Sequence, residues 1–498
     1  MPRWLPSCPL ESPSLSRRAL VRASLSLCAL TLLSACGANR PATVAPSTAV
    51  SSGSVQATTV ATSTTAQTTV AAPTPTSAPT AVPAAQQSAG AAVPVLFWGI
   101  SGPNEPGPTD DQLVTEFNQT HQGVRVTLEQ VPPVGIIAGD KLVTAMASGT
   151  GPDALYLGRH LIPNFAWTKG IAALDSYANA QAFQLDDFYP RFIDESKWRG
   201  KLYGIPYNPD ARGLYWNKSL FQTAGLPADR PPNTWDDLQA ATATLTKKSA
   251  SGDLTQLGYV PGWLNPPTYL GWYVYLWQLG GEFLTPDHRT VAYNSREGVQ
   301  ALQTMVDQMQ QAGGYTAVQQ LSKAASVPTG LDMFSAGHLA MAYATNGAMS
   351  AYDKVKSLDY GIAPFPIPSG GPHVNYSGGF DLTLTAAAKH PAEAWQLIDY
   401  LVSPQPLLRF NLAGHTIPAR KSVANSTGYL SANPRLKFFT DELPFTRWVP
   451  VIVGITEIFD VNNTMYTDAI SGKSSAADAV AASVPRVQAI LAKYADDQ

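Results

Sequence analysis

The sequence is poor in the residues that most catalytic and metal-binding sites use. Its three cysteines, Cys8, Cys28 and Cys36, all lie within the first 36 of 498 residues, and its seven histidines are scattered without H-E-x-x-H or another ligand spacing. Disulfide, zinc and haem-thiolate chemistry therefore has no support in the rest of the chain. The G-x-G-x-x-G, G-x-x-x-x-G-K-[ST] and G-x-S-x-G patterns are also missing, which argues against dinucleotide, phosphate-loop and serine-hydrolase sites.

The acidic pairs that stand out are sequence neighbours. They are Asp186 with Asp187, Asp194 with Glu195, and Asp236 with Asp237. Adjacent side chains point in different directions along a helix or strand, so these pairs do not supply the facing carboxyls of a glycosidase. We interpret them as solvated surface residues. We therefore expect no enzyme and no cofactor, with a surface-tethered carbohydrate-active enzyme kept as an alternative.

Basic charge is scarce after the first residues. Removing residues 1–35 leaves 29 Lys/Arg against 35 Asp/Glu, a net charge of −6. A surface of this charge does not recruit nucleic acid or anionic lipid. We expect no nucleic-acid partner, and membrane attachment only through a lipid anchor.

The N-terminal residues, which do carry basic charge, predict that the protein is exported. Arg17, Arg18 and Arg22 precede an apolar segment, residues 23–36, which is too short to span a bilayer but fits a signal peptide. It ends in Leu-Ser-Ala-Cys, which looks like the lipobox of bacterial lipoproteins, with Cys36 as the lipidated residue. A plain secretory signal with a chance cysteine is the alternative. The double arginine also leaves open twin-arginine export instead of the general route.

Residues 36–92 are Ala, Thr, Ser, Pro, Val and Gln with almost no charge. Such a segment cannot bury a core, so we interpret it as a disordered tether behind the signal segment 1–35. The chain would then sit on the outer face of the cytoplasmic membrane, at the cell surface or in the periplasm.

The part beyond the tether alternates between strand and helix patterns. Apolar runs at 93–101, 124–132 and 153–158 enclose amphipathic stretches at 109–120 and 140–149. This order predicts a parallel sheet wrapped by helices. Helices are also predicted where Thr234 begins a capping arrangement, at 296–313, and near the end of the sequence, where Pro485 predicts a kink. About 400 residues exceed what one core usually serves, so we expect two lobes.

One stretch, residues 262–281, is crowded with aromatics and lacks charge. Its prolines leave too few helical residues for a membrane span. From Tyr269 onward, apolar positions recur at helical spacing and favour a core helix. Trp263, Tyr269 and Trp272, at the loop and first turn, are instead predicted to face a ligand.

Several stretches in order resemble the family 1 extracellular solute-binding proteins, the maltose-binding-protein-like sugar receptors of ABC importers. They include MASGTGPDALYLG, GKLYGIPYNPDARGLYWNKSLFQTAGL with PPNTWDDL, MFSAGHLAMAYATNG, YGIAPFPIPSGG, SGGFDLTLTAAAKHPAEAWQLIDYLVSP, TIPARKSV and DAISGKSSAADAV. The resemblance covers essentially residues 93–498.

The resemblance implies an α/β, two-lobed periplasmic-binding-protein-like fold (class II), each lobe a mostly parallel sheet flanked by helices, with a hinge between the lobes. Lobe 1 is expected at 93–212 and 364–413, lobe 2 at 213–363 and 414–498, and crossing segments near 211–215, 362–366 and 412–417. A monomer would bind a sugar, from mono- to oligosaccharide, in the cleft and deliver it to a permease after hinge closure. A polyamine, phosphate ester or peptide is the alternative solute.

Ligands of parallel sheets bind beyond the carboxyl ends of strands, and a pyranose needs flat aromatics and planar polar groups. The first rule selects Trp98, Ser101, Arg159, His160, Tyr207, Asn208 and Asp210, of which we interpret His160 as a bystander rather than a ligand. The family motifs add Asn346, Gly378, Gly379, Asp381, Arg420 and the aromatic Trp448. Alternatives stay open for some: Trp98 packing under the lobe, a surface ion pair for Arg159, a tight turn for Gly379 and a hinge ion pair for Arg420.

Overall fold

The computed structural model describes residues 91–100, 107–132, 140–179, 183–262, 269–326 and 332–497. All of them belong to one compact unit of the chain, Ala85–Gln498. The predicted signal segment, Cys36 and the tether up to residue 90 lie outside the described residues. So do two predicted ligand residues, Ser101 and Trp263.

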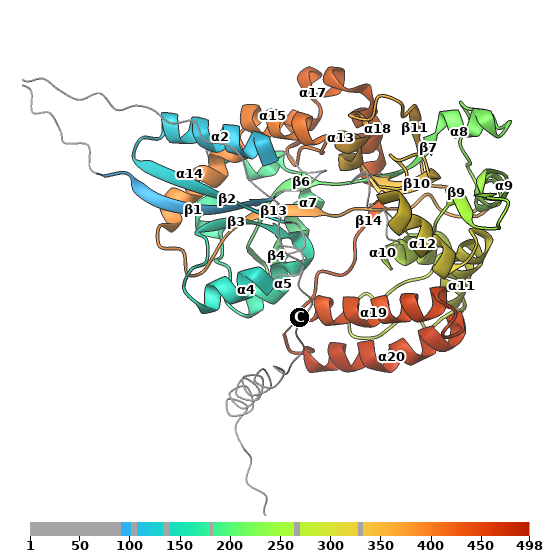
Figure 1. Cartoon of the computed structure of the whole chain (residues 1–498). Coiled ribbons are helices and arrows are strands. Elements are labelled where there is room, and N and C mark those ends of the chain that lie inside the picture. The colour runs from blue at the N-terminus through green and yellow to red at the C-terminus, as the bar shows by residue number, and fades with distance from the viewer. Residues whose placement is uncertain are drawn as a thin grey trace, which may run out of the picture. The chain divides into compact units, whose positions relative to one another are not determined.

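The first of two five-stranded sheets has the order β2-β1-β3-β13-β6. Its strands are β1 (Val93–Ile100), β2 (Val124–Val131), β3 (Ala154–Gly158), β6 (Ile205–Pro209) and β13 (Gly379–Leu384). β1 pairs in parallel with β2 and β3, while β13 runs antiparallel to β3 and β6. In Figure 1, α2 (Gly107–Thr120) and α15 (Pro404–Gly414) lie above this sheet and α4 (Asp140–Ala147) and α5 (Ile162–Trp167) below it.

The second sheet has the order β11-β7-β10-β9-β8. Its strands are β7 (Arg212–Asn217), β8 (Lys247–Lys248), β9 (Leu254–Tyr259), β10 (Leu339–Thr345) and β11 (Tyr360–Ala363). β9 and β10 are parallel, whereas β7 and β8 run antiparallel to their neighbours. Two short pairs complete the strands: β4 (Lys197–Trp198) with β5 (Lys201–Leu202), and β12 (Asn375–Tyr376) with β14 (Thr446–Arg447).

The fold is α/β as predicted, but its sheets are mixed rather than mostly parallel. β7 and β13 each enter a sheet directly after the chain has crossed from the other sheet. A crossover helix that packs on the same sheet makes neighbouring strands parallel, and neither of these strands follows one. The apolar pattern of a strand carries no information about its direction.

Helices surround both sheets and fill the connections. Those before β11 that are not yet named are α6 (Asp175–Ala178), α7 (Pro190–Glu195), α8 (Lys218–Thr223), α9 (Trp235–Leu245), α10 (Leu270–Gln278), α11 (Arg296–Gln311), α12 (Tyr315–Ser326) and α13 (Met349–Tyr352). Those after β13 are α14 (Pro391–Leu401), α16 (Lys421–Ala424), α17 (Thr427–Ala432), α18 (Pro434–Glu442), α19 (Ile455–Ile470) and α20 (Ala476–Lys493). Single 3-10 turns are η1 (Arg159–Leu161), η3 (Leu185–Asp187), η4 (Asn346–Ala348) and η5 (Leu443–Phe445).

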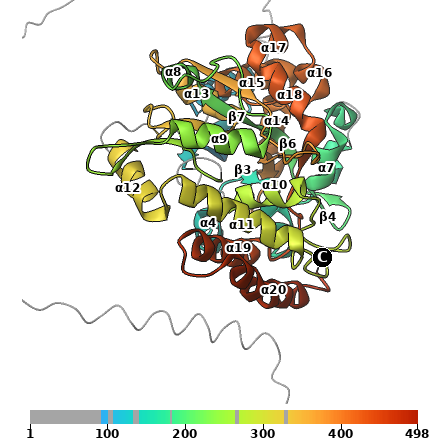
Figure 2. The ribbon, with the colours of Figure 1, turned by 90° about the vertical axis from the view of Figure 1, so that its right-hand side faces the viewer.

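Two separate hydrophobic cores hold the sheets. One gathers around the first sheet and includes Phe97, Leu155 and Phe410. The other gathers around the second sheet and extends into α19 and α20, which lie side by side in Figures 1 and 2. We call the elements around the first core lobe 1 and those around the second core lobe 2. The residue boundaries predicted for the lobes stay predictions.

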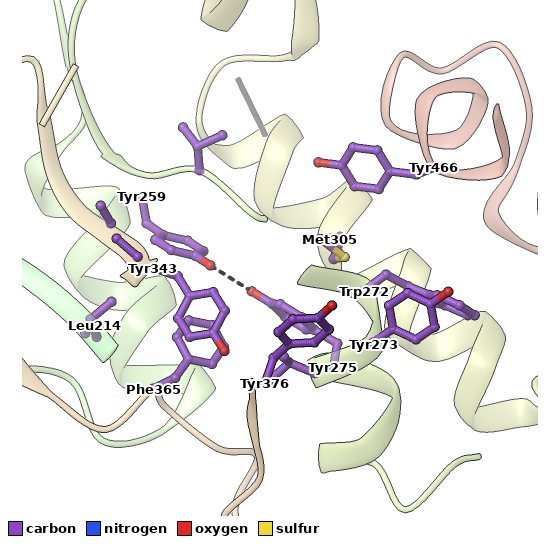
Figure 3. Packing of buried hydrophobic residues seen from close by; sticks show 14 of the residues in the cluster. Leu214, Tyr259, Trp272, Tyr273, Tyr275, Met305, Tyr343, Phe365, Tyr376 and Tyr466 are labelled. Carbon is purple, nitrogen blue, oxygen red and sulfur yellow. Dashed lines mark hydrogen bonds between the residues drawn. The ribbon is translucent and has the colours of Figure 1, made fainter. Parts of the chain in front are cut away.

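The core of lobe 2 is rich in tyrosines whose hydroxyls are paired. The hydroxyls of Tyr259 and Tyr275 form a hydrogen bond of 3.3 Å, drawn as a dashed line in Figure 3, and the Tyr275 hydroxyl also donates to Gln308 at 2.7 Å. Tyr343 likewise donates to Asn375 at 2.7 Å. Buried hydroxyls without partners would be costly, so these bonds allow tyrosines to replace apolar side chains in the core.

The aromatic run forms α10, and every residue from Gly271 to Gln278 in it is buried. Trp272 is fully enclosed, with its ring edge-on to Tyr293 and its indole N–H bonded to the Gly298 carbonyl at 3.2 Å. The prediction of a core helix is confirmed. Among the helices of the described residues, none combines the length and apolarity that a bilayer crossing requires.

Candidate functional site

Arg159 occupies the carboxyl end of β3, where the sheet rule predicted a ligand residue. Its side chain is only 1% exposed and donates a hydrogen bond to the Gly378 carbonyl. Its guanidinium lies 4.4 Å from the Trp448 ring centre and 3.5 Å from a Glu195 carboxylate oxygen. Arg159 thus links lobe 1 to the β12–β13 connection and to a lobe 2 aromatic, so the surface ion pair considered from the sequence is a buried one.

Asp381 lies in the same neighbourhood but inside the sheet. It is fully buried in β13, and a Cβ on Gly204 would approach its carboxylate oxygen to 2.4 Å. Burial raises the pKa of Asp381 to about 7, and the Arg159 guanidinium opposes only part of that shift. This enclosure leaves no space for direct solute contact.

Asp210 and Gly378 link two chain connections to each other. Asp210 lies between β6 and β7, and Gly378 lies between β12 and β13. The Asp210 N–H donates to the Gly378 carbonyl at 3.1 Å, and the Gly378 N–H donates back to the Asp210 carboxylate. Arg212 donates to the same carboxylate at 2.8 Å. Gly379 has φ 129°, and a Cβ there would lie 2.6 Å from the Asn208 carbonyl. Only glycine fits this close approach.

Asn346 ties the crossing connections together. Its side-chain oxygen accepts from the Ala211 N–H at 3.0 Å, and its side-chain nitrogen donates to the His415 carbonyl at 2.7 Å. Ala211 and His415 lie in two of the segments predicted to cross between lobes. The side chain is 1% exposed, so both bonds are shielded from water. Asn346 therefore acts on the hinge rather than on an open surface.

Partly exposed aromatic rings from both lobes meet next to Arg159. His160 of lobe 1 lies 5.5 Å from Phe459 of α19, and Tyr269, at the start of α10, lies 5.6 Å from the same ring. All three side chains are half-buried. They bring flat faces from both lobes to the carboxyl end of β3, where a solute could contact both.

A cavity of about 410 Å³ is lined in part by Trp448. Its walls include the Trp277 ring and the ion pair in which Arg447 donates two hydrogen bonds to Glu282, at 3.0 and 2.5 Å. Its size suits a small ligand. A larger hollow of about 810 Å³ on α11 has no aromatic wall among its lining residues.

Four predicted ligand residues lie where they serve the fold. Trp98 is 2% exposed and donates to Glu129 at 2.9 Å; Tyr207 is enclosed against Phe410. Arg420 donates to the backbone carbonyls of Val402, Gln184 and Phe183. Trp272 is in the lobe 2 core. We therefore leave Trp98, Tyr207, Trp272 and Arg420 out of the proposed site, because their faces and donors are already occupied.

Among the described residues, the arginines around the site have carboxylate partners. Arg159 pairs with Glu195, Arg212 with Asp210 and Arg447 with Glu282. The described residues also contain no group of three or more His, Cys, Asp or Glu placed to hold a metal. The walls of the site thus carry paired charges and aromatic faces.

The family model described as "Bacterial extracellular solute-binding protein" matches residues 101–406. The chain belongs to this family. As a member of an extracellular family, this solute-binding protein is exported, and its family is one of binding proteins rather than enzymes.

Relatives of this solute-binding protein span most of its length. A binding protein of Brucella abortus (strain 2308) is 28% identical over 399 residues, covering 78% of this chain and 90% of the relative. The sn-glycerol-3-phosphate-binding periplasmic protein UgpB of Escherichia coli (strain K12) is 24% identical over 391 residues, covering 72% and 84%. A solute-binding protein from Thermotoga lettingae, solved with alpha-D-tagatose bound, has a TM-score of 0.71 at 23% identity and covers 80% of this chain and 100% of its own.

Sequence reasoning missed Phe459 and passed over His160. Phe459 is a single aromatic within the amphipathic pattern of α19, and nothing in that pattern separates a ligand-facing ring from a core ring. The strand-end rule selected His160 together with Arg159, but the sequence alone favoured the interpretation of His160 as a bystander.

Proposed function

We propose that this protein is the solute receptor of an ABC importer and that its solute is a neutral sugar. The observation that carries the proposal is the meeting of half-buried rings from both lobes, His160 with Phe459 and Phe459 with Tyr269. Sugar rings stack their C–H faces on such aromatics. The Thermotoga relative with bound tagatose supports the same class of solute.

The location of the aromatic rings explains why a bound solute would close the two lobes. A solute that touches His160 of lobe 1 and Phe459 of lobe 2 contacts both lobes only when they are together, so it favours that state. The Asn346 bonds keep the crossing segments in place while the lobes rotate. We propose that an ABC permease recognises the closed form, and that the receptor acts as a monomer.

A phosphate ester is the second candidate, because UgpB is named for sn-glycerol 3-phosphate. A phosphate dianion needs an arginine or lysine whose charge is not already balanced. Arg212 and Arg447 are balanced by Asp210 and Glu282, whereas Arg159 shares the Glu195 carboxylate with Arg191. Arg159 is only 1% exposed and donates to the Gly378 carbonyl, so its charge is turned inward. The exposed charges therefore favour a neutral polyol over a phosphate ester.

A titration panel tests the proposed solute class. The protein is titrated with mono-, di- and oligosaccharides and, in parallel, with sn-glycerol 3-phosphate, a polyamine and a peptide, while tryptophan fluorescence and melting temperature are followed. A sugar alone should raise the melting temperature, because a ligand that binds the native state stabilises it. A response to the phosphate ester and to no sugar would sink the sugar proposal. Chromatography of the recovered sugar separates a receptor from an enzyme, which would return a changed product.

A matched pair of variants tests the location of the site. Phe459→Ala removes the ring that lies between His160 and Tyr269, whereas Phe445→Ala removes an exposed ring stacked on His373. Burying one aromatic side chain is worth about 1.5–3 kcal/mol, so Phe459→Ala should weaken sugar binding by roughly 10- to 100-fold. Phe445→Ala should leave the affinity unchanged. Equal affinities for both variants would move the site elsewhere.

We also propose that Cys36 carries the lipid anchor and that residues 36–92 tether the body to the membrane. The Leu33–Cys36 motif supports this proposal. Several acyl chains hold a protein on a bilayer far more firmly than one. Cys36→Ser should release the protein from the membrane fraction, as measured by fractionation and immunoblotting. A variant that stays with the membrane would contradict the anchor.

A further inference from the structure

The chain after α20 reaches back from lobe 2 to lobe 1. The indole N–H of Trp198 donates to the Asp497 carbonyl at 3.1 Å, and the Arg199 guanidinium donates to the Asp496 carbonyl. Arg199 also lies 3.8 Å from the Asp497 carboxylate. Trp198 packs against the first core, so these bonds join the lobes away from the crossing segments. In Figure 2, the marked end of the chain lies close to β4.

The near end of this segment is fixed to lobe 2. The Tyr494 hydroxyl donates to Glu457 of α19 at 2.5 Å, and a Cβ on Gly454 would lie 2.6 Å from the Tyr494 ring. The other face of Tyr494 is available to lobe 1, where the Trp167 ring meets it edge-on at 5.2 Å. The segment is therefore anchored in lobe 2 at Tyr494 and holds lobe 1 through residues 496 and 497.

A second contact between the lobes lies next to this segment. The Asn164 side chain of α5 accepts from the Gly454 N–H at 2.8 Å and donates to the Thr456 hydroxyl at 3.1 Å. It lies one turn beyond His160, which contacts Phe459. The contacts of residues 494–497 with lobe 1 and the bonds of Asn164 thus lie in one row with the aromatic rings of the proposed site. A rotation of the lobes that separates those rings would also break these contacts.

The contacts between this segment and lobe 1 can form and break reversibly. The side chains of Arg199 and Asp497 are 46% and 34% exposed, so water competes for their ion pair. The hydrogen-bond acceptors on residues 496 and 497 are backbone carbonyls. Their bonds to lobe 1 depend on the path of the backbone and not on the side chains of these residues. Such contacts shift an equilibrium between two states without locking either one.

We propose that residues 494–497 form a strap that holds the two lobes together and raises the population of the closed state before solute binds. The proposal rests on the hinge motion of the proposed function. A receptor that is closed more often binds its solute more tightly, because its apparent dissociation constant depends on the fraction that is competent to bind. The strap would therefore set the receptor's affinity without touching the solute.

Distances between spin labels on the two lobes test the strap. The full-length chain carries Cys8, Cys28 and Cys36 replaced by serine, with labels at Gln119→Cys on α2 and Gln310→Cys on α11, both of which are exposed positions. The strap variants are a deletion of residues 496–498, and Trp198→Phe, which keeps a ring but loses the donor. Lys473→Gln is the control, because it breaks an ion pair with Asp468 inside lobe 2.

Without added solute, the deletion should raise the ratio of long to short distances by about fivefold to thirtyfold, the size expected for losing two hydrogen bonds. Trp198→Phe should give a smaller rise and Lys473→Gln none. Distributions unchanged in both strap variants, or shifted equally in the control, would overturn the strap. Sugar titration of the unaltered protein is scored separately: sugar binding without a strap effect overturns only the strap, and a strap effect without sugar binding overturns only the proposed function.

Discussion

Replacing Asp381 with asparagine should change how the stability of the protein depends on pH. The carboxyl is fully enclosed, and burial raises its pKa from the usual 3.8 to about 7. The unfolded chain binds no proton at this carboxyl between those pH values, but the folded chain does. The free energy of unfolding therefore falls as pH rises from about 4 and levels off above about 7. Asparagine removes this titration and keeps nearly the same shape.

A shift of about three pKa units corresponds to about 4 kcal/mol, of which roughly 3 kcal/mol falls between pH 4.5 and pH 7.5. We expect the stabilities of wild type and Asp381→Asn to be close at pH 4.5, and the variant to be more stable by about 3 kcal/mol at pH 7.5. Urea denaturation of both proteins at several pH values measures the difference, since all other groups titrate alike. A difference that stays constant over this range would refute the reasoning and make Asp381 a charged partner of Arg159.

Two further substitutions test the structural roles assigned to predicted ligand residues. Asn346→Ala leaves the Ala211 N–H and the His415 carbonyl without their partner, so urea unfolding should show a loss of about 2–4 kcal/mol; a loss below about 0.5 kcal/mol would contradict the hinge role. Arg420→Met removes a buried cation from three backbone carbonyls and should cost about 3 kcal/mol while sugar affinity stays unchanged. Weakened binding with full stability would return Arg420 to the site.

Local signals in the sequence were sufficient wherever one short segment determines its own structure. Thr234 and Asp237 predicted the start of α9, and the structure has the reciprocal capping box between them. The box needs only residues three apart, so no distant contact can change it. The start of α2 was predicted less well, because the helix begins at Gly107, two residues before the amphipathic stretch predicted from 109.

Predictions that depend on distant contacts were less secure. Arg420 has the same motif context whether it binds a solute or the carbonyls of a neighbouring loop, and only the fold brings Phe183 and Gln184 to it. The direction of β13 depends on how the chain returns from lobe 2, which leaves no trace in its apolar pattern. Phe459 reaches the site because α19 packs beside the end of β3, a contact between residues about 300 positions apart.

A crystal structure with a bound sugar would test the central claim most directly. The protein is crystallised with the sugar that gives the largest rise in melting temperature. We expect electron density for the sugar against Phe459 and Tyr269 of lobe 2 and His160 of lobe 1, with the lobes together. Sugar density that contacts only one lobe, or lies away from these three rings, would contradict it.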